Sequence, residues 1–269
     1  MALSELKKRD SSSISSALHP LHTPRMEEDI QEDLPLTLLI PLTDSNDCIL
    51  RSLESLKAQK QKPKEVIILN GGVDDRVIRA VKEFNPLITR IYPTPTNLVS
   101  DLLNRGVLLA ENPYTMILFP GSVYLSVYAL QDLYHQAYTN PQADLIYTGV
   151  LLRKKGGDIK YQQPFSKELL KKGEQPTFLE ACLFKTSLFE RVDKFKSFKE
   201  ALDFDFFCSL SEMGMHYISL KRIYLEVERL YHKKKTHAAF EMAVILTRHF
   251  GLKWGIRSLL LRSALNRVL

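Results

Sequence analysis

Clustered thiols are missing from this chain of 269 residues. It has three cysteines, Cys48, Cys182 and Cys208, which lie far apart and form no CxxC pair. A disulfide framework or a zinc site needs thiols at close spacing, so the sequence favours neither. We expect reduced cysteines that serve only in packing, as in an intracellular, cytoplasmic protein.

Long apolar runs are also scarce. Residues 1–20 contain no continuous apolar stretch, so no signal peptide is evident. Residues 112–131 carry no charge, and a run of that length could span a membrane. However, Pro120-Gly121 divides the run, and its flanks have the pattern of a strand followed by a helix. We interpret it as a buried strand and a turn.

The glycine motifs of several large enzyme classes are absent. A dinucleotide site needs GxGxxG directly after the first strand, but Gly71-Gly72 follows the second predicted strand and no third glycine completes the spacing. Neither the P-loop motif GxxxxGK with a following Ser or Thr nor GxSxG occurs. The sequence therefore argues against a Rossmann dehydrogenase, a P-loop NTPase and an α/β-hydrolase.

Positive charge is concentrated at the C-terminus. The net charge is +6, and residues 233–269 contribute +7 through eight Lys or Arg against the single acid Glu241, so residues 1–232 carry −1. A nucleic acid, an anionic membrane surface or a phosphate-bearing ligand could each match such a segment. No nucleic-acid-binding motif is present, so nucleic acid is not an expected partner.

Short apolar runs alternate with segments of helical spacing from Leu34 onward. Nearly continuous apolar strands between amphipathic helices indicate parallel strands that are covered on both faces. The sequence thus predicts an α/β, Rossmann-like fold with a mostly parallel central sheet and flanking helices. The predicted strands are 36–42, 65–69, 87–92, 114–119, 144–148 and 217–227, and the predicted helices are 48–60, 75–84, 98–111, 126–138, 203–213 and 236–250.

We expect three parts along the chain. Residues 1–33 are polar and cannot bury enough apolar surface to offset the entropy of ordering, so we predict a flexible leader. The α/β domain occupies 34–235, and 236–269 is a basic helical C-terminal segment. Apolar residues cover most of the circumference of that last helix. It could contact a membrane peripherally, with Trp254 and the leucines inserted, or pack on the domain or on a partner.

Ligands bind at the carboxyl ends of strands in such sheets, here at loops 41–44, 69–72, 93–97 and 119–122. The segments around these loops resemble family-2 glycosyltransferases with the GT-A fold, over about 36–232. LIPLTD at 39–44, SLESLKAQ at 52–59 and PKEVIILNGG at 63–72 are similar to the family's IIPTYN, LxSLLxQ and EIIVVDDGS. Asn104-Arg105-Gly106 resembles RNxG, 114–125 resembles YIxFLDADDxL, and 183–214 resembles the acceptor-side block.

The resemblance implies an enzyme that transfers a sugar from a nucleotide-sugar donor to an unknown acceptor, which is a glycan, lipid or protein. Pro41 and Thr43 would line the nucleotide pocket. Asn70 stands where the family has the acid that contacts the uracil ring, and an amide can still pair with a base edge. Asp203 stands where the family has its general base. Asp205 would point elsewhere, because residues two apart do not share a helix face; a pair of solvated or capping acids is the alternative.

The family's DxD acids, which hold Mg²⁺ or Mn²⁺, are replaced here by Pro120-Gly121-Ser122. The usual metal site cannot be built from these residues, so no metal ligand is predicted and a divalent metal is doubtful; Ser122 remains as a donor-site contact. Cationic side chains could meet the charge of the leaving diphosphate instead. Otherwise the lysines form a solvated loop, and the domain is a catalytically inactive binding or scaffold module. The cationic candidates are Arg105, His232, Lys233, Lys234, Lys235 and His237.

Overall fold

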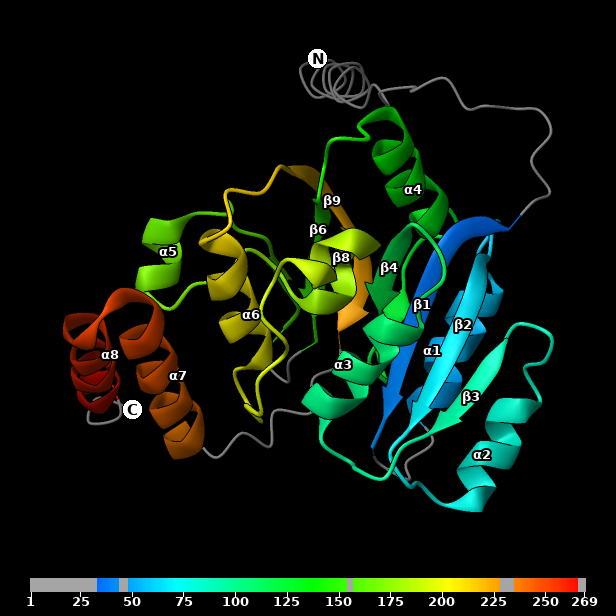
Figure 1. Ribbon diagram of the computed structural model, residues 1–269, viewed down its shortest axis with the longest axis horizontal. Helices are drawn as coiled ribbons and strands as arrows, with labels where there is room; N and C mark the ends of the chain where they lie inside the picture. Colours follow the sequence, from blue (N-terminus) through cyan, green and yellow to red (C-terminus); the bar gives the residue numbers. More distant parts are fainter. Residues whose placement is uncertain (1–32, 44–47, 154–156, 228–234, 266–269) are drawn as a thin grey trace, which may run out of the picture. The chain divides into compact units, whose positions relative to one another are not determined.

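The computed structural model describes residues 33–43, 48–153, 157–227 and 235–265 (Figure 1). Of the predicted leader over 1–33, only Asp33 is among them. The first elements are β1 (Leu34–Leu42), α1 (Cys48–Lys57), β2 (Pro63–Asn70), α2 (Asp75–Lys82), β3 (Arg90–Pro93), α3 (Val99–Leu109), β4 (Tyr114–Ile117), β5 (Val123–Tyr124) and α4 (Ala129–Thr139). They are followed by β6 (Leu145–Leu152), β7 (Ile159–Tyr161), α5 (Lys167–Lys171), the 3₁₀ turn η1 (Leu179–Ala181), β8 (Cys182–Lys185), η2 (Thr186–Glu190), α6 (Leu202–Ser211), β9 (Tyr217–Val227), α7 (Lys235–Phe250) and α8 (Leu252–Leu265).

The described strands form one mixed sheet in the order β3-β2-β1-β4-β8-β6-β9-β5, with β7 paired to β6. β1 is parallel to β2 and β4, β2 to β3, and β6 to β9. β8 runs antiparallel between β4 and β6. The predicted α/β fold with a mostly parallel sheet is confirmed. β5, β7 and β8 were not predicted, because each is too short to produce a pattern of its own.

Helices cover both faces of this sheet, as the apolar strands indicated. Leu36, Leu38 and Ile40 of β1 lie in one core with residues of α1, α2 and α4. Leu39, which points the other way, lies in a second core with residues of α3, α6 and α7. Successive side chains of a strand point to opposite faces, so a strand covered on both faces must be apolar throughout.

The uncharged run over 112–131 folds as predicted. It supplies β4, the turn at Pro120-Gly121, β5 and the start of α4. Among the described residues, no helix is both long enough and apolar enough to cross a membrane.

Helix α3 lies close to the sheet because Gly106 has no side chain. A Cβ atom on Gly106 would lie 2.6 Å from Cδ1 of Leu69 and 3.0 Å from Cδ1 of Leu39. Asn104 donates from Nδ2 to the carbonyl of Phe195 (2.9 Å) and accepts from the amide of Phe195 (2.9 Å). In the segment that resembles RNxG, Gly106 therefore lets α3 pack against the sheet, and Asn104 holds the loop at Phe195 against α3.

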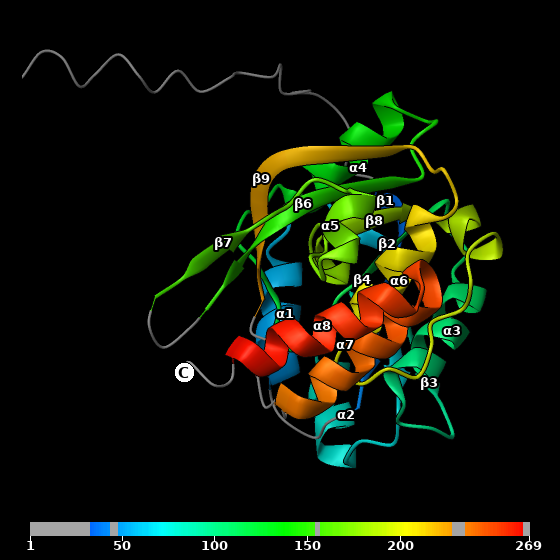
Figure 2. The same cartoon turned by 90° about the vertical axis from the view of Figure 1, so that its left-hand side faces the viewer.

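The described part of the basic C-terminal segment forms α7 and α8, which lie side by side in Figure 2. Gly251, with a φ of 93°, separates the two helices at the predicted stop. Ile245 and Leu246 of α7 are buried in the second core. A Cβ atom on Gly255 would lie 2.8 Å from the carbonyl oxygen of Ala243, so α8 crosses α7 at close range.

His249 ties α7 to α6. Its Nε2 atom lies 3.1 Å from Oδ1 of Asp205, and its Nδ1 atom lies 2.9 Å from Oε1 of Glu212. Burial lowers the pKa of His249, but the hydrogen bonds to Asp205 and Glu212 raise it by more, so the pKa lies above its usual value. The charged imidazolium is favoured because it can donate to both carboxylates at once.

Gly106→Val should lower the free energy of unfolding by about 1–3 kcal/mol, because the new side chain would overlap Leu69 and Leu39. Urea denaturation followed by circular dichroism measures the change. Leu108→Val, at a 75% exposed position of the same helix, should change the free energy by less than about 0.5 kcal/mol. Equal effects of the two variants would show that close packing at Gly106 is not the cause.

His249→Ala should destabilise the protein more at about pH 6 than at about pH 8.5. A raised pKa means that the folded state holds the proton more tightly than the unfolded state does. The stabilisation is therefore complete below the unfolded pKa of about 6.5 and is lost as the pH rises through the folded pKa. Urea denaturation at both pH values measures it. His135→Ala, at an exposed position on α4, is the control, and a pH-independent effect of His249→Ala would contradict the ion pair.

Candidate functional site

The carboxyl ends of β1, β2 and β3 meet at one edge of the sheet. In the parallel register Leu42 lies beside Asn70, and Asn70 lies beside Pro93. The amide of Gly71 donates to the carbonyl of Leu42 (2.9 Å), and a Cβ atom on Gly71 would lie 3.2 Å from Cα of Asn97. Three loops therefore converge on Gly71, and only glycine allows this close approach of backbone to backbone.

The predicted pocket residues Pro41 and Thr43 belong to this edge. Pro41 lies opposite Leu69 within the sheet and is buried, whereas Thr43 directly follows β1 and is partly exposed. Since Leu42 pairs with Asn70, Thr43 and Gly71 extend from neighbouring strand ends. The structure thus brings Thr43 and Asn70 together, with Pro41 behind them.

The side chain of Asn70 has a fixed orientation. Its Oδ1 atom accepts from the amides of Gly72 (3.0 Å) and Val73 (3.1 Å). Backbone amides only donate, so the atom that faces them must be the oxygen, and both of its lone pairs are used. Asn70 therefore offers a ligand the Nδ2 donor and not an acceptor.

The loop after β4, where the resemblance implies metal ligands, is held in place by α1. The amide of Gly121, a residue with a φ of 94°, donates to Oγ of Ser52 (2.8 Å). Ser122 carries the only side-chain oxygen of Pro120-Gly121-Ser122, and it is 2% exposed. In the part of the chain that the structure describes, no group of three or more His, Cys, Asp or Glu could hold a metal ion. These residues do not fit a divalent metal.

Asp203 lies at the same edge of the sheet. It is 4% exposed, and its Oδ2 atom accepts from the amide of Leu179, 3.3 Å away. Leu179 opens η1, which leads directly into β8. β8 runs antiparallel to β4 with Leu183 opposite Met116, so η1 lies at the carboxyl end of β4. Topology thus joins Asp203 to an edge whose loops after β1, β2 and β3 come more than 100 positions earlier in the sequence.

A second acid, Glu180, lies near Asp203. It is fully buried in η1, beside the buried thiol of Cys182. Burial raises the pKa of Cys182 well above its usual range, and the nearby charges of Asp203 and Glu180 raise it further. Glu180 was not predicted as a site residue from the sequence, although it is the single charged residue in the apolar run 177–184.

Asp203 and Asp205 point in different directions, as the helix geometry predicted. Asp203 contacts η1 at the carboxyl edge, whereas Asp205, 2% exposed, faces His249 of α7. Of these two acids, only Asp203 faces this edge.

The structure describes only some of the cationic residues that were predicted to contact the diphosphate. Arg105 is exposed on α3, where its guanidinium donates to the hydroxyl of Tyr92 (3.0 Å) and lies 5.5 Å from the centre of that ring. His237 is exposed near the start of α7, whose first residue is Lys235. The other candidates, His232, Lys233 and Lys234, lie outside the described residues.

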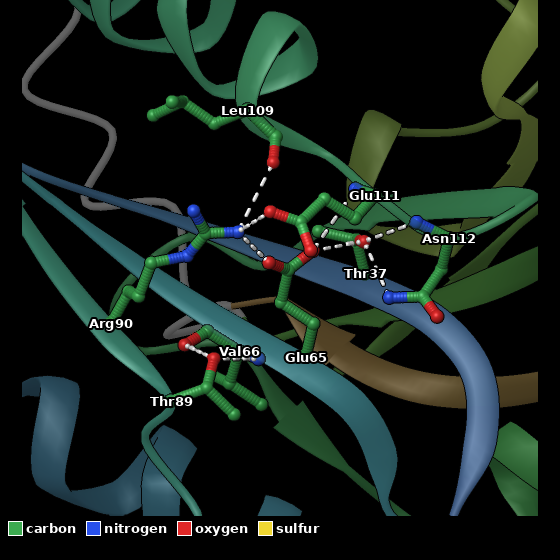
Figure 3. A network of polar contacts seen from close by, with 8 residues as sticks. All are labelled: Thr37, Glu65, Val66, Thr89, Arg90, Leu109, Glu111 and Asn112. Atoms are coloured by element: carbon green, nitrogen blue, oxygen red, sulfur yellow. Dashed lines mark hydrogen bonds and ion pairs between the residues drawn. The ribbon is translucent and has the colours of Figure 1, made fainter.

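Another polar cluster lies at the opposite, amino edge of the sheet (Figure 3). Glu65, 6% exposed, accepts from the hydroxyl of Thr37 (2.6 Å), from Arg90 and from the amide of Glu111 (3.2 Å). Burial raises the pKa of Glu65, but these hydrogen bonds outweigh it and the net pKa is lowered. A depression of about 360 Å³ opens here, and Asn112 also lines it. Since the charges of Glu65 and Arg90 pair with each other, the cluster joins β2 to β3.

Comparison with known proteins agrees with this architecture. The model of the glycosyl transferase family 2 matches residues 37–202. Residues 1–349 of TarS from S. aureus superpose with a TM-score of 0.60 at 15% identity, over 84% of this chain and 71% of that one. A second TarS structure, in complex with UDP-GlcNAc, gives 0.60 at 15% identity over 83% and 70%.

A mannosyltransferase from Pyrobaculum calidifontis, PcManGT in complex with GDP-Man and Mn²⁺, gives a TM-score of 0.60 at 15% identity, over 88% of this chain and 76% of that one. No curated protein matches this chain. At such identities the similar structures establish the fold alone. The family model adds a sequence match over more than half of the chain, across the strand-end loops and as far as α6. The protein is therefore a member of glycosyl transferase family 2.

Proposed function

We propose that the protein transfers a sugar from a nucleotide-sugar donor to a hydroxyl group of an acceptor, at the carboxyl edge of the sheet. One observation carries the proposal: Thr43, Asn70 and Asp203 come from distant parts of the sequence and lie at this edge. Membership of glycosyl transferase family 2 supports the reaction class. The complexes of TarS with UDP-GlcNAc and of PcManGT with GDP-Man support the class of donor.

The nucleoside part of the donor binds at the ends of β1 and β2. Pro41 forms the apolar floor, and Thr43 and Asn70 supply hydrogen-bonding groups. Because Oδ1 of Asn70 already accepts from Gly72 and Val73, its Nδ2 group donates to the base. This donor replaces the carboxylate acceptor that the resemblance implies at this position.

Asp203 acts as the general base. It accepts the proton of the acceptor hydroxyl while that oxygen forms a bond to the anomeric carbon. The bond between this carbon and the diphosphate oxygen breaks, and its electron pair leaves with the nucleoside diphosphate. The amide of Leu179 orients the carboxylate. The acceptor is a hydroxyl of a glycan, lipid or protein.

Residues 120–122 contain no carboxylate that could hold a metal, so other groups neutralise the charge of the leaving diphosphate. Preorganised cations and hydrogen-bond donors stabilise negative charge that develops on a leaving group. We assign this role to Arg105, Lys233 and Lys234, with the hydroxyl of Ser122 as a further hydrogen-bond donor.

A catalytically inactive binding or scaffold module is the second candidate. The absence of carboxylates from Pro120-Gly121-Ser122 favours it, because metal-assisted departure of the diphosphate is then lost. The two candidates differ in one measurable property, since only the enzyme releases nucleoside diphosphate.

Asp203→Asn should lower the release of nucleoside diphosphate by at least about 100-fold, because an amide cannot accept the proton. The release is measured with UDP-, GDP- and dTDP-sugars over a panel of glycan, lipid and peptide acceptors. Nucleotide binding by calorimetry should change little. Asp205→Asn, on the same helix, is the matched control and should keep turnover while the melting temperature falls. If no nucleotide sugar shifts the melting temperature, the proposed donor is wrong; binding without turnover would favour the inactive module.

Asn70→Asp should shift the base preference toward uracil. Nδ2 of Asn70 pairs with an acceptor such as N3 of cytosine, whereas N3 of uracil carries a hydrogen and pairs with a carboxylate. The ratio of the dissociation constants for UDP and CDP should therefore change by about tenfold. Calorimetric titration with both nucleotides measures this ratio. Asn97→Asp adds the same charge at the same edge and should leave the ratio unchanged; an unchanged ratio in Asn70→Asp would remove Asn70 from the base site.

A further inference from the structure

The C-terminal hairpin of α7 and α8 has an inner and an outer side. On the inner side, Ile245 and Leu246 are buried and Phe250 packs against the same core. Figure 2 shows the two helices next to each other along their lengths, and Gly255 permits their close crossing. The hairpin is thus a fixed part of the described domain, which leaves its outer side to be explained.

Apolar side chains are exposed on that outer side, and we call them the hairpin face. They follow helical spacing, with one pair four residues apart on α7 and three residues at intervals of four and three on α8, so each group lies on a single side of its helix. Exposed apolar side chains that gather on one part of a globular protein mark an interaction site. The hairpin face consists of Phe240 (66% exposed), Val244 (39%), Leu252 (66%), Ile256 (48%) and Leu259 (44%).

Exposed cationic side chains of α8 lie beside the hairpin face. Lys253 and Arg257 are exposed there, each within one helical turn of one of its apolar residues, whereas Arg248 of α7 pairs with Asp193 (3.4 Å). Residues 235–265 contain a single acid, Glu241, and its carboxylate is turned inward to the amides of residues 199–201. The surface is therefore apolar with a cationic border and no neighbouring carboxylate from these helices.

Trp254 is not part of this face. Its ring is partly buried against the second core and lies between two cations, with Nζ of Lys171 5.6 Å and Cζ of Arg257 5.4 Å from its centre. The insertion of Trp254 into a membrane, one of the possibilities from the sequence, does not match this placement.

We propose that the hairpin face binds the surface of an anionic phospholipid bilayer. The five apolar side chains insert between the lipid headgroups, and Lys253 and Arg257 contact the lipid phosphates. A second copy of the chain is a poorer occupant, because two cationic borders would face each other. The bilayer contact is independent of the glycosyl transfer proposed above.

Co-sedimentation of the full chain with lipid vesicles tests the proposal. The chain should bind vesicles of phosphatidylcholine and phosphatidylserine at least about tenfold more tightly than vesicles of phosphatidylcholine alone. The triple variant Phe240→Ser/Leu252→Ser/Ile256→Ser should abolish the binding. The double variant Lys253→Glu/Arg257→Glu should remove the preference for the anionic vesicles. Leu108→Ser/Tyr138→Ser, which changes side chains that are 75% and 71% exposed on α3 and α4, should bind as the unaltered chain does.

Three results would overturn the proposal. The first is equal binding to neutral and anionic vesicles, and the second is binding that survives the triple variant. The third is a dimer in sedimentation velocity that the triple variant converts to a monomer, which would make the hairpin face a contact between copies. Melting temperatures show whether the variants fold. If the triple variant does not fold, the double variant still tests the proposal through the loss of the preference for anionic vesicles.

Discussion

Burial of β1 on both faces is the constraint on which the site depends. Leu38 and Leu39 point to opposite cores, so the middle of the strand is closed to ligands. Ligand chemistry is thereby confined to the two ends of the sheet. At the amino edge, Glu65 and Arg90 neutralise each other and tie β2 to β3. At the carboxyl edge, three loops meet at Gly71, and their polar groups face outward from the strand ends.

Helix α6 connects this edge to the C-terminal hairpin. Asp203 on one side of α6 contacts η1, while Asp205 on another side contacts His249 of α7. Both carboxylates are buried, and each needs its partner because an unpaired buried charge is costly. The proposed base, Asp203, and the residue that holds the C-terminal hairpin, Asp205, therefore belong to one helix of ten residues.

The fold could be predicted where the apolar spacing was long and regular. The strand at 217–227 was predicted with its exact bounds, and the divergence of Asp203 and Asp205 followed from helix geometry alone. β8 could not be predicted, because four residues in an apolar run become a strand only through their antiparallel partners β4 and β6.

Much of the site depended on contacts that sequence spacing does not encode. Glu180 is near Asp203 only because α6 packs over η1. The loop that carries the buried Ser122 is held by Ser52, far away in the sequence, through the amide of Gly121. The orientation of the Asn70 amide is set by hydrogen bonds from the backbone amides of Gly72 and Val73, directly after β2. These features follow from packing and local backbone geometry.

The inward turn of Glu241 has a consequence for the chemistry of the domain. The residue before α6, Ala201, provides no side-chain cap, and Glu241 accepts instead from the amides of Lys199 (3.0 Å), Glu200 (2.8 Å) and Ala201 (3.1 Å). A carboxylate at this position also complements the positive end of the helix dipole. Shortening the chain before α7 would remove this shared acceptor two residues ahead of Asp203. The C-terminal hairpin thus holds the backbone that leads directly into the helix of the proposed base.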